Sequence, residues 1–182
     1  MVRAFRDTSV PADALDRVLA AALRAPSAGN TQAVDLIVLE GPDETSRYWS
    51  ITLADPVTFR WQGLFTAPVL VIAVVSADAY AARYAEADKS HTGLDTVDAW
   101  PVPYWWVDGG MAVENLLLAC VAEGLGACFF GLFEHERAVL DAFGVPEDRR
   151  AVGTIALGWP LADRRGRSAG RVRRMDQLHR GA

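Results

Sequence analysis

The sequence predicts a single domain of the α+β or α/β class, in which one sheet lies between helical layers. The chain has 182 residues, 51% of them hydrophobic, which suits one domain with a sizeable core. Residues 69–75 form a continuous apolar run rich in β-branched side chains, which is typical of a central strand buried on both faces. Segments with helical periodicity separate most of the strand-like runs, so we expect helices to cover the sheet.

The first half of the chain alternates between helix and strand. Apolar residues recur on one face of residues 11–24, which predicts an amphipathic helix. Residues 34–39 are predicted to form a strand, closed by a turn at the Gly-Pro pair 41–42. Residues 43–53 are expected to form a second helix that packs through Trp49.

The second half contains the most hydrophobic predicted helix, residues 107–123. This segment is apolar nearly all round, so we expect it at the centre of the molecule. Residues 89–103 lack periodicity and indicate a long excursion, which in a compact domain is often functional. The other predicted elements are helices at 77–87 and 134–143 and strands at 125–133 and 151–157.

Motifs for metal chemistry or side-chain catalysis are missing from the sequence. It contains no Gly-x-Gly-x-x-Gly after a strand, no phosphate-binding P-loop, no His-Glu-x-x-His and no Gly-x-Ser-x-Gly. His91, His135 and His179 lack ligand spacing, so we expect surface or hydrogen-bonded histidines. Cys120 and Cys128 match no metal or redox motif and are expected to be buried thiols. A bound cofactor that carries its own reactivity fits this pattern.

A net charge of −5 conceals a basic C-terminal stretch. Solvated arginines and a clamp for one phosphate both explain it, and Arg suits a clamp because its planar guanidinium binds two phosphate oxygens. The acidic body and the lack of a basic helix with interleaved aromatics argue against nucleic acid. No apolar run is long enough to span a bilayer and no signal peptide is recognisable, so we expect a cytoplasmic protein without membrane contact. The late arginines are Arg164, Arg165, Arg167, Arg171, Arg173, Arg174 and Arg180.

The most informative segment is the predicted loop at residues 25–32, Ala-Pro-Ser-Ala-Gly-Asn-Thr-Gln. Pro26 ends the preceding helix, because the residue before a proline is pushed out of the α region. Ser27, Asn30 and Gln32 supply side-chain donors and acceptors, and the small residues between them let a flat ligand approach the backbone. Turn formation alone also explains Ser27 and Asn30.

This loop resembles the flavin-binding loop of the nitroreductase family, and the resemblance extends over nearly the whole chain. In that family a basic residue at the position of Arg3 contacts the phosphate or ribityl chain of FMN, and the loop contacts the isoalloxazine ring. The segments at 108–119 and 124–131 are similar to the family's central helix and the strand that follows it. The resemblance therefore implies that Pro26, Ser27, Ala28, Asn30 and Gln32 surround the flavin.

Backbone amides just after that strand face the flavin N5 atom in the family, which implies the same position for Gly131 and Leu132. A backbone donor at N5 stabilises added electron density and leaves the flavin face open for hydride transfer. A buried helix packed on a core strand explains the same pattern without flavin.

The Arg-rich end adds a second implied contact with the cofactor. Arg171 and Arg173 look like the family's late basic pair, so residues 163–182 are expected to form an arm that completes the phosphate site of a domain at 1–162. Alternate residues of an extended chain point to the same side, so both guanidinium groups can reach one anion. Changing both to Ala is expected to lower FMN occupancy without unfolding the core.

An aromatic segment at residues 100–106, Trp-Pro-Val-Pro-Tyr-Trp-Trp, resembles one bacterial subgroup of the family. Tyr104 and Trp105 are expected either to wall the substrate pocket above the flavin ring or to bury in a dimer interface. Family members usually carry a short helix and an Arg-x-Ser-type signature before the position of Arg3, whereas this sequence starts at Met1. Either the start is assigned too late or the phosphate clamp is weakened, at about 1.5–3 kcal/mol for one lost contact.

The resemblance implies an α+β, nitroreductase-like fold with a central mixed or antiparallel sheet. It also implies a homodimer with two FMN sites at the subunit interface. NAD(P)H would reduce the FMN, and a flat aromatic acceptor such as a nitroaromatic or a quinone would take the electrons in a ping-pong reaction. No side chain needs to be catalytic, since flavin position and a stacking pocket suffice. The alternatives are a specialised flavin oxidase, a deazaflavin-linked reductase, and a flavin-sequestering or vestigial member.

Overall fold

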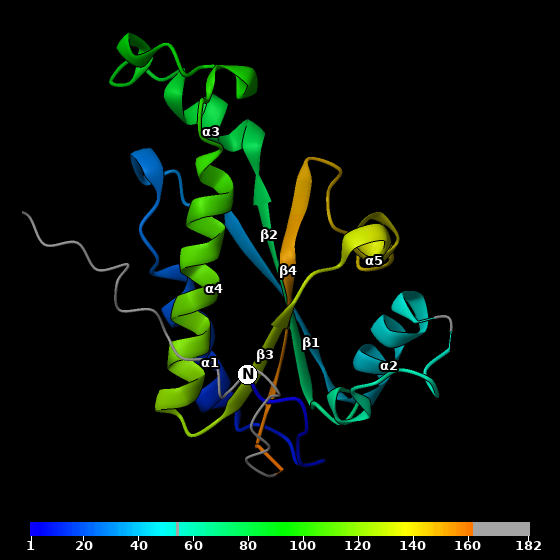
Figure 1. The fold of residues 1–182 in the computed structure, drawn as a ribbon. Helices are drawn as coiled ribbons and strands as arrows, with labels where there is room; N and C mark the ends of the chain where they lie inside the picture. Colours follow the sequence, from blue (N-terminus) through cyan, green and yellow to red (C-terminus); the bar gives the residue numbers. More distant parts are fainter. Residues whose placement is uncertain (54, 162–182) are drawn as a thin grey trace, which may run out of the picture.

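The computed structural model describes residues 1–53 and 55–161 (Figure 1). Within them, four antiparallel strands form one sheet in the order β1-β2-β4-β3. Helices cover both faces of this sheet, which confirms the predicted α+β class. In chain order, the strands are β1 (Val34–Glu40), β2 (Val69–Ser76), β3 (Gly126–Phe130) and β4 (Arg149–Gly158).

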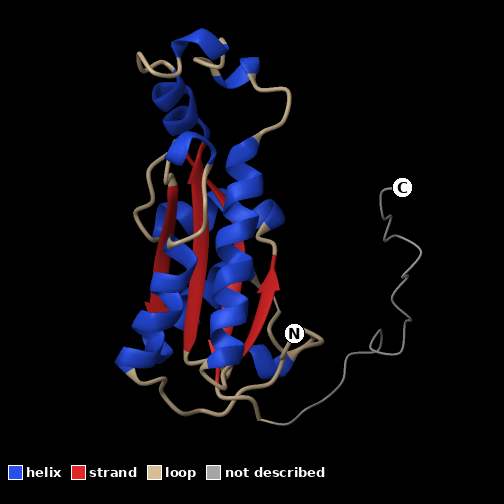
Figure 2. Ribbon diagram, turned by 90° about the vertical axis from the view of Figure 1, so that its left-hand side faces the viewer, coloured by secondary structure: helices blue, strands red, loops and turns tan. Residues whose placement is uncertain are grey.

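Strand β2 divides the core in two, because its side chains alternate between the two faces of the sheet. Leu70 and Ile72 belong to one hydrophobic cluster, and Val69 and Val71 belong to another. The whole strand is buried, which explains why its apolar run carries no polar alternation. One cluster includes α2 (Gly41–Thr52) and α5 (Glu136–Ala142), and the other includes α1 (Ala12–Leu23) and α4 (Tyr104–Ala122) (Figures 1 and 2).

Several boundaries differ from the predictions. Gly41 adopts φ +80° and begins α2 directly, with a proline in the first turn, so no separate turn closes β1. Helix α4 begins at Tyr104, earlier than predicted, because Pro103 is its N-cap residue. Strand β3 ends at Phe130, and irregular backbone then leads to a 3₁₀ turn at Phe133–His135. The strand predicted at 125–133 is therefore shorter than expected.

The excursion between β2 and α4 lies at one end of the molecule (Figure 1). It begins with α3 (Ala77–Tyr84), which is shorter than predicted, and continues with 3₁₀ turns at Ser90–Thr92 and Val97–Ala99. Trp100 returns the chain to the core, where its ring meets those of Tyr80 and Tyr84 at centroid distances of 5.8 and 4.6 Å. No helix among the described residues combines the length and hydrophobicity needed to cross a bilayer.

Candidate functional site

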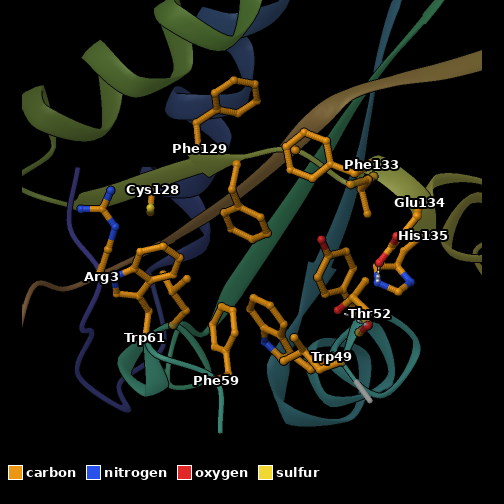
Figure 3. A pocket seen from close by; sticks show the side chains of 16 residues that line it. Arg3, Trp49, Thr52, Phe59, Trp61, Cys128, Phe129, Phe133, Glu134 and His135 are labelled. Atoms are coloured by element: carbon orange, nitrogen blue, oxygen red, sulfur yellow. Dashed lines mark hydrogen bonds and ion pairs between the residues drawn. The ribbon is translucent and has the colours of Figure 1, made fainter. Parts of the chain in front are cut away.

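A cavity of about 340 Å³ opens on the α2 and α5 face of the sheet, beside the end of β3 (Figure 3). Its volume suits a small molecule or a cofactor. Half of its lining comes from one unbroken stretch, Cys128 to His135. The other lining residues are Arg3, Tyr48, Trp49, Thr52, Leu53, Phe59, Trp61 and Leu64.

Aromatic rings form much of the cavity wall. The rings of Trp49 and Phe130 are stacked, with centroids 5.8 Å apart and planes at 19°. Phe59 lies 6.3 Å from Trp49 and 5.8 Å from Trp61. Such walls suit a flat ligand, because aromatic faces stack on one another. Sequence reasoning placed Trp49 only in the core and missed Phe59 and Trp61, although these two aromatic residues are close together in the sequence.

Arg3 brings positive charge to one end of this cavity. The N-terminal segment is held in place by a hydrogen bond of 2.8 Å from the Val2 amide to the Ala127 carbonyl on β3. The Arg3 guanidinium lies 5.4 Å from the centroid of the Trp61 ring, in cation–π contact. Arg60 contacts the same ring at 5.5 Å but is not part of the lining.

The segment predicted to face the flavin N5 atom, Gly131 and Leu132, also lines the cavity. A Cβ on Gly131 would lie 2.8 Å from the ring of Phe133, so the lack of a side chain lets that ring approach the backbone. Phe133 is 88% exposed and adopts φ +45°. This conformation is rare for a bulky residue, and such strain concentrates at functional sites.

Glu134 and His135 lie at the other end of the cavity from Arg3 (Figure 3). Glu134 Oε1 and His135 Nε2 are 3.5 Å apart. Two further polar side chains of the lining stay protonated at neutral pH. Burial raises the pKa of Tyr48, whose hydroxyl donates to Thr154, and burial also raises the pKa of the Cys128 thiol.

The loop predicted to bind flavin lies on the other side of the sheet, beside α3 and α4 (Figure 1). None of residues 26–32 lines the cavity. Gly29, Asn30 and Gln32 adopt φ of +62°, +55° and +54°, so three residues of this loop are left-handed. Ser27 Oγ accepts a hydrogen bond from the Gln32 amide at 2.9 Å, and Asn30 Oδ1 accepts one from Gln32 Nε2 at 3.0 Å. Both side chains therefore stabilise the turn.

Side chains from α3 and α4 hold this loop. Asp108 Oδ2 accepts hydrogen bonds from the Ala28 amide at 2.8 Å and from the Tyr80 hydroxyl at 2.6 Å. Arg83 Nε donates to the Gly29 carbonyl at 2.9 Å. None of these three contacts was predicted. The available signal was Asp108 itself, a carboxylate in an otherwise apolar stretch of the most hydrophobic helix.

The aromatic pair at the start of α4 does not line the cavity either. Trp105 is 8% exposed, and its ring lies 6.1 Å from both Tyr80 and Trp100, inside the chain's own core. Tyr104 is 43% exposed and lies beside Trp100. The last two predicted flavin contacts, Arg171 and Arg173, lie outside the described residues.

Comparison with known proteins supplies the family. A curated relative from Archaeoglobus fulgidus, provisionally named an NADH dehydrogenase/NAD(P)H nitroreductase, is 26% identical over 98% of this chain and 91% of its own. The nitroreductase CinD from Lactococcus lactis, solved with nicotinic acid, has the same fold, with a TM-score of 0.79, 18% identity and coverage of 100% of this chain and 95% of CinD.

A further solved structure, a provisionally named nitroreductase from Desulfovibrio desulfuricans in complex with FMN, superposes with a TM-score of 0.67 at 21% identity. The superposition covers 100% of this chain and 91% of the Desulfovibrio desulfuricans chain. Residues 1–159 match the Nitroreductase family as a whole. The chain therefore belongs to the nitroreductase family.

Proposed function

We propose that the protein is an FMN-dependent oxidoreductase that takes electrons from NAD(P)H and passes them to flat acceptors such as nitroaromatics and quinones in a ping-pong reaction. The observation that carries the proposal is the meeting of Arg3, Gly131 and Leu132 at one aromatic cavity. Arg3 is far in the sequence from the neighbouring pair Gly131 and Leu132, and the family resemblance implies a flavin contact for all three. The names of the relatives agree with this activity.

The cavity has the chemistry that FMN needs. Arg3 supplies a cation at one end for the phosphate or ribityl part, and stacked rings such as Trp49 and Phe130 suit the isoalloxazine. Trp49 Nε1 is buried and has no acceptor among the described residues, so a carbonyl or ring nitrogen of a ligand would relieve an unsatisfied donor. When bound, FMN supplies the two-electron chemistry.

The chain's own residues then bind and orient rather than react. Backbone groups at Gly131 and Leu132 stabilise charge at the flavin edge without blocking its face. The buried neutral side chains of Tyr48 and Cys128 exclude water from the floor of the cavity. Phe133 is the most exposed ring of the lining, and we place the acceptor beside it.

We further propose a homodimer in which each FMN site takes residues from two chains. The cavity and the Pro26–Gln32 loop lie on opposite sides of one sheet, so a single chain cannot close both around one flavin. The outer face of α4 supports the dimer, since Val107, Leu118 and Val121 are 43%, 58% and 73% exposed. Apolar residues at this spacing form a stripe that a second copy can cover.

The first test is the flavin content of the purified chain and its reduction by NADH and NADPH without oxygen. We expect about one FMN per chain, reduced by a nicotinamide donor, and parallel double-reciprocal plots with a quinone. Arg3→Ala is expected to raise the Kd for FMN about 10-fold, because a charge-assisted contact is lost. Arg60→Ala is the matched control, because Arg60 contacts the same Trp61 ring but does not line the cavity.

Three results would count against the proposal. A chain that binds no added FMN excludes a flavoenzyme. Bound FMN that neither NADH nor NADPH reduces favours a deazaflavin donor or a flavin-sequestering protein. Equal losses in Arg3→Ala and Arg60→Ala would show that the Trp61 contact, rather than the cavity, explains the effect of Arg3.

A further inference from the structure

We propose that Asp108 is a positioning residue, which holds the Pro26–Gln32 loop from α4 in the conformation that the flavin site requires, before any flavin binds. The proposal rests on the proposed function for the role of the loop. The attachment itself rests on contacts within one chain.

Asp108 is the buried end of this attachment. Asp108 is 1% exposed, and its Oδ2 atom accepts hydrogen bonds from both the Ala28 amide and the Tyr80 hydroxyl. A carboxylate is costly to bury, so a buried one is kept only where strong hydrogen bonds compensate it. Here one of its two donors is the backbone of the loop itself, which makes the position of the loop part of that compensation.

Tyr80 is a dependable second donor. Tyr80 is fully buried. Burial raises its pKa, and the hydrogen bond and charge of Asp108 raise it further, so the hydroxyl keeps its proton at neutral pH. Tyr80 belongs to α3 and Asp108 to α4. Their contact of 2.6 Å therefore joins both helices to the loop.

The loop needs such support because of its backbone. Gly29, Asn30 and Gln32 are left-handed. Glycine and asparagine tolerate this region, whereas it is unfavourable for the longer side chain of Gln32. Strained residues of this kind persist only when surrounding contacts fix them. Arg83, bonded to the Gly29 carbonyl, and the Tyr84 ring, against which Gly29 packs, are the other fixed points.

A loop that is ordered in advance binds its ligand more tightly, because less conformational entropy is lost on binding. Loosening the anchor should therefore weaken FMN binding although Asp108 is not expected to touch the flavin. We expect Asp108→Leu, which removes the acceptor, to raise the Kd for FMN at least 10-fold. Asp108→Asn keeps an acceptor oxygen, so its Kd for FMN should be only about 3-fold above that of the wild type.

The control is Asp148→Asn, the same chemical change as Asp108→Asn at a carboxylate that accepts from Ser76 and Arg149 and not from any residue of the Pro26–Gln32 loop. It should leave the Kd for FMN unchanged. At saturating FMN, the visible absorption of the bound flavin should change in Asp108→Leu but not in Asp148→Asn, because only the first alters the contacts of the loop with the ring. A merely structural role for Asp108 would lower the melting temperature without this spectral change.

Hydrogen exchange of the flavin-free wild type keeps the test independent of whether the variants fold. The Ala28 amide should exchange at least 10-fold more slowly than the neighbouring Gly29 amide, for which the described residues provide no acceptor. Tyr80→Phe removes one donor to Asp108 and should raise the Ala28 exchange rate by a smaller factor than Asp108→Leu.

Equal exchange at Ala28 and Gly29, or an unchanged Kd for FMN in a folded Asp108→Leu, would overturn the proposal. Failure of the proposed function looks different. In that case the wild type itself binds no FMN, while slow exchange at Ala28 still supports the attachment.

Discussion

The two faces of the sheet are both covered by helices and apolar side chains, but one borders a cavity and the other holds a hydrogen-bonded loop. The α2 and α5 face leaves a cavity, walled by aromatic rings and bordered by Arg3 at one end and Glu134 and His135 at the other. The α1 and α4 face carries a packed hydrophobic cluster, and Asp108 on α4 fixes a loop there by a hydrogen bond. Empty space with few internal hydrogen bonds favours a ligand, whereas a hydrogen-bonded strained loop favours a fixed shape.

The residues that we propose to bind flavin therefore fall into two groups, one on each face of the sheet. Each group contains a left-handed residue with a side chain: Asn30 and Gln32 in the loop, and Phe133 at the cavity. These three are all of the non-glycine residues with positive φ in the described part of the chain. Backbone strain therefore marks both groups, and it does so on opposite faces.

The largest expected effect compares two equally buried tryptophans, one on each side. Trp105 and Trp49 are both 8% exposed. Trp105→Ala is expected to cost about 3–5 kcal/mol of unfolding free energy, because it leaves a void in a filled core. The loss of unfolding free energy in Trp49→Ala should be smaller by at least about 1 kcal/mol. Trp49 borders existing space, and its removal also removes an unsatisfied donor. Urea unfolding of the flavin-free variants measures both; equal losses would mean that the cavity is closed in solution.

The next effect separates the outer surfaces. Leu118→Glu on α4 should raise the dimer dissociation constant about 100-fold, or about 2.7 kcal/mol, because a carboxylate would be buried against a second copy. Val57→Glu is the control, as Val57 is 86% exposed but lies away from α4. Sedimentation equilibrium distinguishes the two. Unchanged dimerisation in Leu118→Glu would move the interface to another surface.

A smaller effect is expected at the cavity itself. Gly131→Val should raise the Kd for FMN about 10-fold, because its methyl groups occupy space beside the predicted N5 position. Stability should change little, since the side chain in the way, Phe133, is exposed and free to turn aside. Adding Phe133→Ala should remove any remaining loss of melting temperature without restoring FMN affinity. Restored affinity would identify the displaced ring, rather than the lost space, as the cause.

The smallest effect concerns the two thiols, one on each face. Burial raises the pKa of Cys120 to about 12, above the value of about 8.5 in an unfolded chain. The unfolded state therefore loses its proton first, and stability is lost as pH rises above about 8.5. From linkage, this group alone should lower the unfolding free energy by about 0.7 kcal/mol between pH 8 and 9. Cys120→Ala should remove that part of the slope, and a slope that persists would assign it to other groups.

The sequence predicted the fold well where the pattern is one-dimensional. The apolar run of β2 and the periodicity of α1 each report burial directly, and both elements lie within a residue or two of the predicted bounds. Boundaries failed where a single proline or glycine has two possible uses. Pro103 could end an excursion or begin a helix, and Gly41 could form a turn or start α2.

The site was predicted less completely, because its contacts are long-range. The family resemblance indicated Arg3, Gly131 and Leu132, and all three line one cavity. No local sequence pattern indicated that Phe59 lines the same cavity. The anchor was likewise invisible, since Ala28 and Asp108 are 80 positions apart. A carboxylate in a hydrophobic helix is a signal that something distant must be bonded to it, yet the sequence does not name the partner.

The unbroken stretch from Cys128 to His135 has a consequence for how this protein can change. Because one short segment supplies half of the cavity lining, a single exchanged cassette can reshape the binding site. The loop and its anchor lie on the other face and would be inherited intact. Under the proposed function, exchange of this one segment would alter which acceptors bind, while the contacts that order the loop on the opposite face stay unchanged.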